Sequence, residues 1–257
     1  MFTKIEQTRW QGSQFSSPEQ PTVEVSDSWL NSEGQQRARY RFARELMRGN
    51  DVLEIGCGSG HGSVTLLKSG ARSVTSVDTS PDAIESARRH YAASNLHYQL
   101  ADLQKLPYSK ASFDVIVAFD IIEQVTDPEK LLKEFHRVLR SGGTLIISSH
   151  NRQYFSEGYD HSLYLRRGFT PAELIEILSH RFKPPYRIYG QFEIGQLTTS
   201  GVSSYIPTIT EGLNTGDMKK CSKKSFRQGH AYLSEDDFVF SEQHLEEAPI
   251  LLALCHK

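Results

Sequence analysis

The sequence predicts an α/β fold in which helices cover both faces of a mostly parallel β-sheet, and three observations lead to this prediction. Short apolar segments typical of strands alternate with segments of helical periodicity from about residue 35 to residue 192. A cluster of glycines follows the first of these strands, and an acidic residue follows the second. Because strands joined by helical crossovers run in the same direction, this alternation favours parallel pairing.

Composition places the 257-residue chain among ordinary globular proteins. Hydrophobic residues make up 38% of the chain and charged residues 23%, which excludes a disordered polymer. The formal net charge of −2 lacks the basic excess of a nucleic-acid-binding protein. We therefore expect no nucleic-acid partner.

The cysteine content and the lengths of the apolar runs indicate in which cellular compartment the protein is expected. Cys57, Cys221 and Cys255 are too few and too widely spaced for a disulfide framework or a zinc site. We therefore expect no metal site and a reducing, cytoplasmic location. The first residues lack the apolar stretch of a secretory signal. The longest apolar run, Ile250–Cys255, is far shorter than the ~20 residues that cross a bilayer, so no membrane span is expected.

The chain divides into an N-terminal arm and one domain. Residues 1–33 are polar and aperiodic, which indicates an arm, and residues 34–257 form the single predicted domain. The first helix is expected from about Gln35 to Met47, where apolar residues recur at spacings of three and four. Residues 196–230 interrupt the alternation with Gly, Ser, Thr and Lys, and an insertion of this length is typical of a lid or a specificity element.

Strands are expected where short apolar or β-branched segments lie between turn residues. They are Val52–Ile55, Ser73–Val77, Leu96–Leu100, Asp114–Phe119, Thr144–Ser149, Tyr186–Phe192, Phe238–Phe240 and Ile250–Cys255. Helices are expected between them, and three begin with proline, which is favoured in a first turn. They are a helix containing Val64 and Leu67, a helix that opens at Pro81, Pro128–Arg140 and Pro171–His180.

The most informative segment, residues 52–62, reads VLEIGCGSGHG. Glycines let the backbone turn tightly and approach a ligand, and the helix N-terminus behind them favours negative charge. A nicotinamide-dinucleotide site requires G-x-G-x-x-G, but counting from Gly56 the third glycine position holds His61. A P-loop is excluded because no G-K-[ST] follows. A glycine-rich turn without a ligand stays open.

Acidic residues follow the second and third strands. Asp78 lies 22 residues after Gly56, a spacing at which a carboxylate reaches the two hydroxyls of a ribose. Asp78 could instead cap the next helix, but together with the glycine loop it favours a ribose-containing ligand. Asp102 could accept a hydrogen bond from an exocyclic amine while Leu103 covers a purine face. By itself, Asp102 is a surface acid.

Four motifs carry a resemblance to a known family, and they read VLEIGCGSGHGS, SVDTSPDAI, ADLQKLPYSKASFDVIVAFDIIEQV and HRVLRSGGTLIISSHN. Over roughly residues 33–192 the chain resembles class I S-adenosylmethionine-dependent methyltransferases. It is most similar to the branch that contains ubiquinone-biosynthesis O-methyltransferases and sugar methyltransferases. The resemblance implies a Rossmann-like, doubly wound, seven-stranded sheet, mostly parallel with an antiparallel last strand. It also implies methyl transfer from S-adenosylmethionine, leaving S-adenosylhomocysteine, to a small-molecule or glycan acceptor, most often at a hydroxyl oxygen.

The resemblance further implies a set of cofactor-binding residues. The loop glycines would cradle the methionyl part, Asp78 would hold the ribose, Asp102 and Leu103 would bind adenine, and Phe119 would add a main-chain contact. Arg39 would pair with the cofactor carboxylate, or be only a solvated helix arginine. The full set is Arg39, Glu54, Gly56, Cys57, Gly58, Gly60, Asp78, Thr79, Asp102, Leu103 and Phe119.

Candidate catalytic residues follow from the acceptor chemistry. A hydroxyl needs a base or a metal to remove its proton, whereas an amine needs only to be neutral. His161 is the first candidate base, because relatives carry a histidine in a loop before a similar helix, and His150 and Glu123 are the reserves. The chain departs from many relatives at Gln124, where they have histidine, and at His150-Asn151. A histidine mechanism therefore does not transfer directly from them.

Other classes of function stay open at this point. N-methylation of a small amine and a cofactor-binding scaffold protein without turnover are the alternatives. A nicotinamide oxidoreductase is opposed by the glycine spacing. The sequence does not indicate the oligomeric state.

Overall fold

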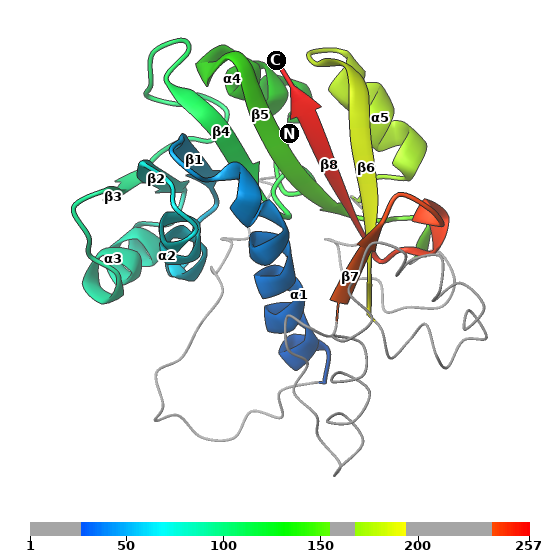
Figure 1. The fold of residues 1–257 in the computed structure, drawn as a ribbon, viewed down its shortest axis with the longest axis horizontal. Helices are drawn as coiled ribbons and strands as arrows, with labels where there is room; N and C mark the ends of the chain where they lie inside the picture. The colour runs from blue at the N-terminus through cyan, green and yellow to red at the C-terminus, as the bar shows by residue number, and fades with distance from the viewer. Residues whose placement is uncertain (1–26, 155–167, 194–237) are drawn as a thin grey trace, which may run out of the picture.

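The computed structural model describes residues 27–154, 168–193 and 238–257, so the predicted insertion at 196–230 lies outside the described residues. In the described part, eight strands form one sheet with helices on both faces (Figure 1). The strands are β1 (Asp51–Ile55), β2 (Ser73–Asp78), β3 (Leu96–Leu100), β4 (Phe113–Ala118), β5 (Leu139–His150), β6 (Lys183–Glu193), β7 (Phe238–Ser241) and β8 (Ile250–His256). The helices are α1 (Asp27–Ala43), α2 (His61–Lys68), α3 (Pro81–His90), α4 (Pro128–Val138) and α5 (Pro171–Ser179), with short 3-10 turns at Arg44–Leu46 and Leu245–Glu247.

The sheet order β3-β2-β1-β4-β5-β8-β6-β7 confirms the predicted doubly wound, mostly parallel architecture. Strands β1 to β5 pair in parallel, whereas β8 is antiparallel to both β5 and β6. The predicted count of seven strands is one too low, because β7 adds an antiparallel edge strand to β6. Pairing with a sheet edge satisfies the backbone of this short segment, which explains why it is extended.

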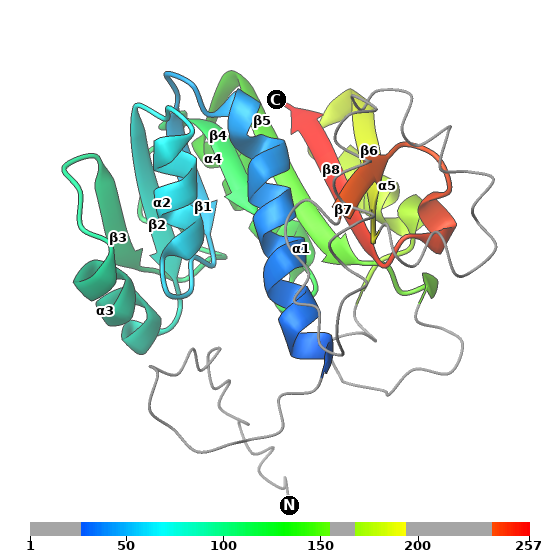
Figure 2. The ribbon, with the colours of Figure 1, turned by 60° about the horizontal axis from the view of Figure 1, so that its bottom comes forward.

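Helix α1 differs from its prediction at both ends. It begins at Asp27, well before Gln35, so the last residues of the predicted arm are helical. Its apolar residues form almost no helical stripe, so periodicity could not find its first turns. It ends at Ala43, and the 3-10 turn follows before the buried Met47. Figure 2 shows α1 crossing one face of the sheet, and this tertiary packing holds the helix.

Three helices begin as the sequence predicts, at a side-chain cap followed by proline. The Oγ of Ser80 accepts a hydrogen bond from the amide of Ala83 at 3.2 Å, and Asp127 caps α4 in the same way. Thr170 and Glu173 form a reciprocal capping box at α5. Each such cap stabilises its helix by roughly 0.5–2 kcal/mol, so local sequence fixes where these helices begin.

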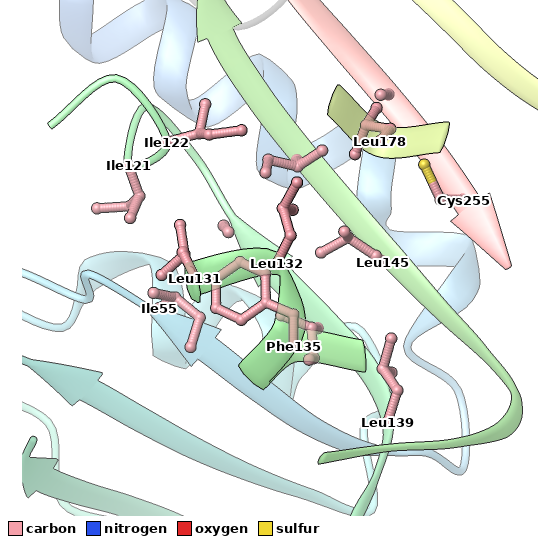
Figure 3. Packing of buried hydrophobic residues seen from close by; sticks show 14 of the residues in the cluster. Ile55, Ile121, Ile122, Leu131, Leu132, Phe135, Leu139, Leu145, Leu178 and Cys255 are labelled. Carbon is pink, nitrogen blue, oxygen red and sulfur yellow. The ribbon is translucent and has the colours of Figure 1, made fainter. Parts of the chain in front are cut away.

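Apolar residues fill both faces of the sheet. On one face, α4 buries Leu131, Leu132 and Phe135 completely against the central strands (Figure 3). Helices α1, α2 and α3 cover the opposite face (Figure 2). Burial of each large side chain stabilises the fold by roughly 1.5–3 kcal/mol. This core on both faces holds the loops at the strand ends in place.

Two expectations from composition can be compared with the described residues. Cys57 and Cys255 are both free thiols and both buried. None of the helices in the described ranges is long and apolar enough to cross a membrane.

Candidate active site

The carboxyl ends of neighbouring parallel strands bring the predicted site residues to one edge of the sheet. Ile55 of β1 is in register with Val77 of β2 and with Ala118 of β4. The residues that follow these three strands therefore lie side by side. Ligands of open α/β sheets bind at such an edge, so we consider it the candidate site.

The loop after β1 is built so that only glycine fits. Gly56, Gly58 and Gly60 have φ angles of +73°, +52° and +90°. A Cβ on Gly56 would lie 2.2 Å from the side chain of Ile121, and one on Gly60 would lie 2.8 Å from the hydroxyl of Tyr98. The positive φ angles and these close contacts both favour glycine at the two positions. The loop therefore has no side chains there, and its backbone forms the surface.

Glu54 lies buried beneath this loop with both carboxylate oxygens bonded. It accepts hydrogen bonds from the hydroxyls of Tyr40 at 2.7 Å, Ser76 at 2.8 Å and Ser63. Burial raises the pKa of Glu54, and these three hydrogen bonds oppose that rise. Through these hydrogen bonds Glu54 connects α1, α2 and β2 beneath the loop.

Asp78 joins the end of β2 to the glycine loop. Its Oδ2 accepts from the amide of Gly58 and its Oδ1 from the amide of Ser80, both at 2.9 Å. The cap of α3 is Ser80 and not Asp78, so the cap alternative for Asp78 does not hold. A carboxylate has about four acceptor positions, and two of them remain for a ligand at this edge.

The other predicted cofactor residues after β2 and β3 differ in exposure. Thr79 and Asp102 are exposed, and Asp102 accepts a hydrogen bond from the amide of Gln104 at 2.8 Å. Leu103 is buried in the core. Cys57 is also buried, and burial followed by the nearby carboxylates raises the pKa of its thiol, which argues against a nucleophilic role.

Arg39 reaches this edge from α1 and is only 1% exposed, so it is not a solvated helix arginine. Its Nη1 donates to the side chain of Gln191 at 2.9 Å, and its Nη2 contacts Oδ2 of Asp120 at 2.5 Å. The guanidinium lies 5.7 Å from the ring centroid of Phe119. Its buried Nε has no partner among the described residues.

A buried acid in the loop after β4 contacts a partly exposed histidine at the end of β5. The ring Nδ1 of His150 lies 2.7 Å from Oε1 of Glu123, and the His150 amide donates to the same oxygen at 3.1 Å. Glu123 is 3% exposed, and its Oε2 has no partner in the described part of the chain. His150 and Glu123 are therefore brought together, whereas His161 lies outside the described residues.

Sequence reasoning missed Asp120, which completes this cluster. Asp120 has a φ of +55° directly after Phe119, and its Oδ1 accepts from the hydroxyl of Ser148 at 2.7 Å. An acid at the end of a central strand was a usable signal, because the site lies at that edge. Without a partner in the sequence motif, however, nothing distinguished Asp120 from a surface acid.

Charges within this cluster shift the pKa values of two groups. Burial opposes the charged form of Asp120, but the positive charges of Arg39 and His150 outweigh burial and lower its pKa. Burial also favours neutral His150, but the hydrogen bond to Glu123 and the charge of Asp120 outweigh burial and raise the pKa of His150. The opposite charges of Asp120, Arg39 and His150 thus act on one another within this partly buried cluster.

Comparison with known proteins agrees with this geometry. Residues 53–147 match the family described as "Methyltransferase domain". This part of the chain is therefore similar to a methyltransferase domain. It is 37% identical over 145 residues to a probable S-adenosylmethionine-dependent methyltransferase of Mycolicibacterium smegmatis, a match that covers 56% of this chain and 53% of that protein. It is 31% identical over 142 residues to a ubiquinone biosynthesis O-methyltransferase of Coxiella burnetii, covering 51% of this chain and 60% of that protein.

These matches leave part of each relative uncovered, since the chain spans only 53% and 60% of their lengths. Solved structures extend the likeness in fold. An S-adenosylmethionine-dependent methyltransferase from Mesorhizobium loti has a TM-score of 0.55 at 19% identity, covering 87% of this chain and all of that chain. A [4+2]-cyclase has a TM-score of 0.54 at 16% identity and covers 86% of this chain and 81% of that one, so the fold by itself does not fix the reaction.

S-adenosylmethionine is the cofactor of this methyltransferase family, and the site fits it. Gly56 and Gly60 pack closely against Ile121 and Tyr98, and with no side chains of their own they leave the loop backbone available to a ligand. The buried carboxylate of Asp78 lies at the base of this loop and keeps acceptor positions for a diol. The orphaned Nε of Arg39 offers a donor for an anionic group at the same edge.

Proposed function

We propose that the chain transfers the methyl group of S-adenosylmethionine to a hydroxyl oxygen of a small-molecule or glycan acceptor. The observation that carries this proposal is the contact of buried Glu123, in the loop after β4, with His150 at the end of β5, next to the cofactor edge. Bound cofactor supplies an electrophilic methyl on a sulfonium. The O-methyltransferase name of one relative supports the same acceptor chemistry.

In this proposal the residues around the cofactor hold its three parts. Gly56, Gly58 and Gly60 would cradle the methionyl part by their backbone, and Asp78 would hold the ribose hydroxyls. Arg39 would bind the cofactor carboxylate through its unpartnered Nε. The adenine would lie on the side of β3, near Asp102 and Leu103, with Thr79 after β2, and Phe119 after β4 would add a main-chain contact to the cofactor.

The chain's own groups would remove the acceptor proton. Glu123 accepts from Nδ1 of His150, which fixes the ring and makes Nε2 the atom that takes the proton. The hydroxyl oxygen attacks the methyl carbon, the carbon–sulfur bond breaks, and the hydroxyl proton goes to Nε2. Because the pKa of His150 is raised, the neutral base becomes abundant only above the usual pKa of about 6.5. The rate should therefore rise with pH across a range above that value.

A matched acceptor panel tests the proposal. The full chain is incubated with S-adenosylmethionine and with pairs of compounds that carry either a hydroxyl or an amine on one scaffold. Formation of S-adenosylhomocysteine with the hydroxyl member and not the amine supports O-methylation. Turnover only with amines indicates N-methylation, in which the carboxylates of Asp120 and Glu123 would orient the neutral amine. Cofactor binding without turnover on any acceptor indicates a scaffold protein.

The compartment stays a proposal as well. The free thiols of Cys57 and Cys255 support a reducing, cytoplasmic location. Measurement of the compartment in cell fractions tests it.

A further inference from the structure

Asp120, Glu123 and His150 form a cluster with the donor atoms of a metal site. One ligand atom from each residue lies within 4.8 Å of the other two. In the ranges that the structure describes, this is the single group of three or more His, Cys, Asp or Glu residues with such spacing. The residues come from the end of β4, the loop after it and the end of β5, so the sheet core holds all three.

A second observation points to a ligand within this cluster. Oε2 of Glu123 is buried and has no hydrogen-bond partner in the described part of the chain, although the side chain is only 1% exposed. Buried carboxylate oxygens are almost always partnered by protein, water or an ion. The same carboxylate uses its other oxygen to hold His150, so the orphaned oxygen belongs to the cluster itself.

The donor types favour a particular class of ion. One imidazole nitrogen and two carboxylate oxygens suit Mn²⁺, Fe²⁺ or Zn²⁺ better than Ca²⁺ or Mg²⁺, which prefer oxygen donors throughout. Three protein ligands leave coordination positions open, as metal sites that bind substrates do.

The surroundings of Asp120 are compatible with an ion. Arg39 pairs with its Oδ2 and the Ser148 hydroxyl donates to its Oδ1, and carboxylates that bind metals are oriented by such partners. Each oxygen keeps a second acceptor position for the ion. Arg39 offsets one of the two carboxylate charges, so the ion would be bound less tightly than by two unpaired acids.

We propose that Asp120, Glu123 and His150 bind one divalent transition-metal ion whose open positions take the acceptor hydroxyl. The second half of this statement rests on the proposed methyl transfer, whereas ion binding does not. A bound ion lowers the pKa of a hydroxyl, so the proton leaves to solvent when the acceptor binds, and the oxygen then attacks the methyl carbon as the carbon–sulfur bond breaks. With an ion bound, His150 would hold the ion and the proton would go to solvent, whereas without an ion His150 would be the base of the proposed function.

The experiment measures Mn²⁺ binding to the full chain after treatment with chelator, without cofactor or acceptor. Equilibrium dialysis and the electron paramagnetic resonance spectrum of Mn²⁺ should report one ion per chain, and Zn²⁺ should displace it. Glu123→Gln and His150→Gln should each weaken Mn²⁺ binding by more than the roughly 10–100-fold that the loss of an orienting partner costs. His150 is the more exposed of the two, so its variant keeps the test valid if Glu123→Gln does not fold.

The exposed pair of Glu129 and His180 provides a matched control. Nδ1 of His180 contacts Oε1 of Glu129, as Nδ1 of His150 contacts Oε1 of Glu123. Glu129→Gln should leave Mn²⁺ binding unchanged. The metal site is overturned if the wild type binds no ion. It is also overturned if the Glu123 and His150 variants bind Mn²⁺ as tightly as the wild type does. S-adenosylhomocysteine binding and acceptor turnover are measured on the same preparations. Turnover that persists in chelator, without a bound ion, refutes the metal site and leaves the proposed methyl transfer standing, whereas ion binding without turnover does the reverse.

Discussion

Two clusters of acidic and basic side chains lie at opposite edges of the same sheet. The amino-edge cluster consists of Asp51, Arg72, Asp114 and Arg140, and the carboxyl-edge cluster consists of Arg39, Asp120, Glu123 and His150. At the amino edge, Arg72 binds both oxygens of Asp51, and Arg140 contacts Asp114 at 2.7 Å. Its arginines are 57% and 37% exposed. At the carboxyl edge, Arg39 and Glu123 are almost completely buried, and each has one side-chain atom with no partner among the residues that the structure describes.

This difference in burial and in partners indicates a stabilising ion-pair network at the amino edge and a candidate ligand site at the carboxyl edge. Exposed ion pairs contribute little, because water competes for the same charges. Buried charges are costly to desolvate, and a fold keeps them with unsatisfied atoms mainly where a ligand completes them. We therefore expect similar residue types to tie strands together at one edge and to bind a ligand at the other.

The largest expected effect is on turnover at the carboxyl edge. Glu123→Gln removes the carboxylate that holds His150, so kcat should fall by about 10²–10⁴-fold, the typical contribution of proton transfer. The dissociation constant of S-adenosylhomocysteine, measured by calorimetry, should stay within a few-fold of the wild type. Glu129→Gln is the control for a glutamate–histidine pair at the surface. Normal kcat in Glu123→Gln would remove the pair from the reaction.

Neutralising one aspartate at each edge compares the two clusters directly. Asp120→Asn leaves the buried guanidinium of Arg39 without its charge partner, so the free energy of unfolding should fall by roughly 3–5 kcal/mol. Urea unfolding of the Asp120→Asn and Asp51→Asn variants measures the loss in the free energy of unfolding for each. Equal losses for the two variants would show that burial does not distinguish the clusters.

Cofactor affinity should depend on Asp78. Asp78→Ala removes the carboxylate that would hold two ribose hydroxyls, and hydrogen bonds to charged groups contribute roughly 1.5–3 kcal/mol each. The dissociation constant of S-adenosylhomocysteine should rise by about tenfold or more. Asp82→Ala, which removes an exposed acid four residues further along, is the control. If both variants bind equally well, Asp78 serves only to anchor the loop.

The smallest effect is expected at the amino edge, and it depends on pH. Hydrogen bonding to Arg72 holds the pKa of Asp51 well below its usual range. A depressed folded-state pKa contributes stability above the unfolded pKa of about 3.9, and this is lost as pH falls. Asp51→Asn should therefore lower the melting temperature at pH 7 by no more than about 2–4 °C. The difference from the wild type should shrink below pH 4, and a difference that persists there would contradict the ionic explanation.

Local sequence predicted the glycine loop after β1 and the acid after β2, whereas their role in binding a cofactor stays a prediction. The glycine loop, Asp78 and the caps at Ser80 and Thr170 depend on residues that are close together in the chain. Their structure follows from backbone freedom and short-range hydrogen bonds, which the sequence displays directly. The strand segments were found for a similar reason, because buried parallel strands are short and continuously apolar.

The sequence by itself thus determined the doubly wound fold and the glycine loop after β1, and it named Glu123 and His150 as candidates. Only the tertiary structure decided which charges meet. Arg39 and Gln191, which form a hydrogen bond, are 152 positions apart in the chain. Asp120, after β4, accepts a hydrogen bond from Ser148 on the neighbouring strand β5. Neither contact leaves a periodic or local signal. Long-range pairing depends on which strand ends become neighbours and how α1 crosses the sheet, and burial there turns ordinary polar residues into a site.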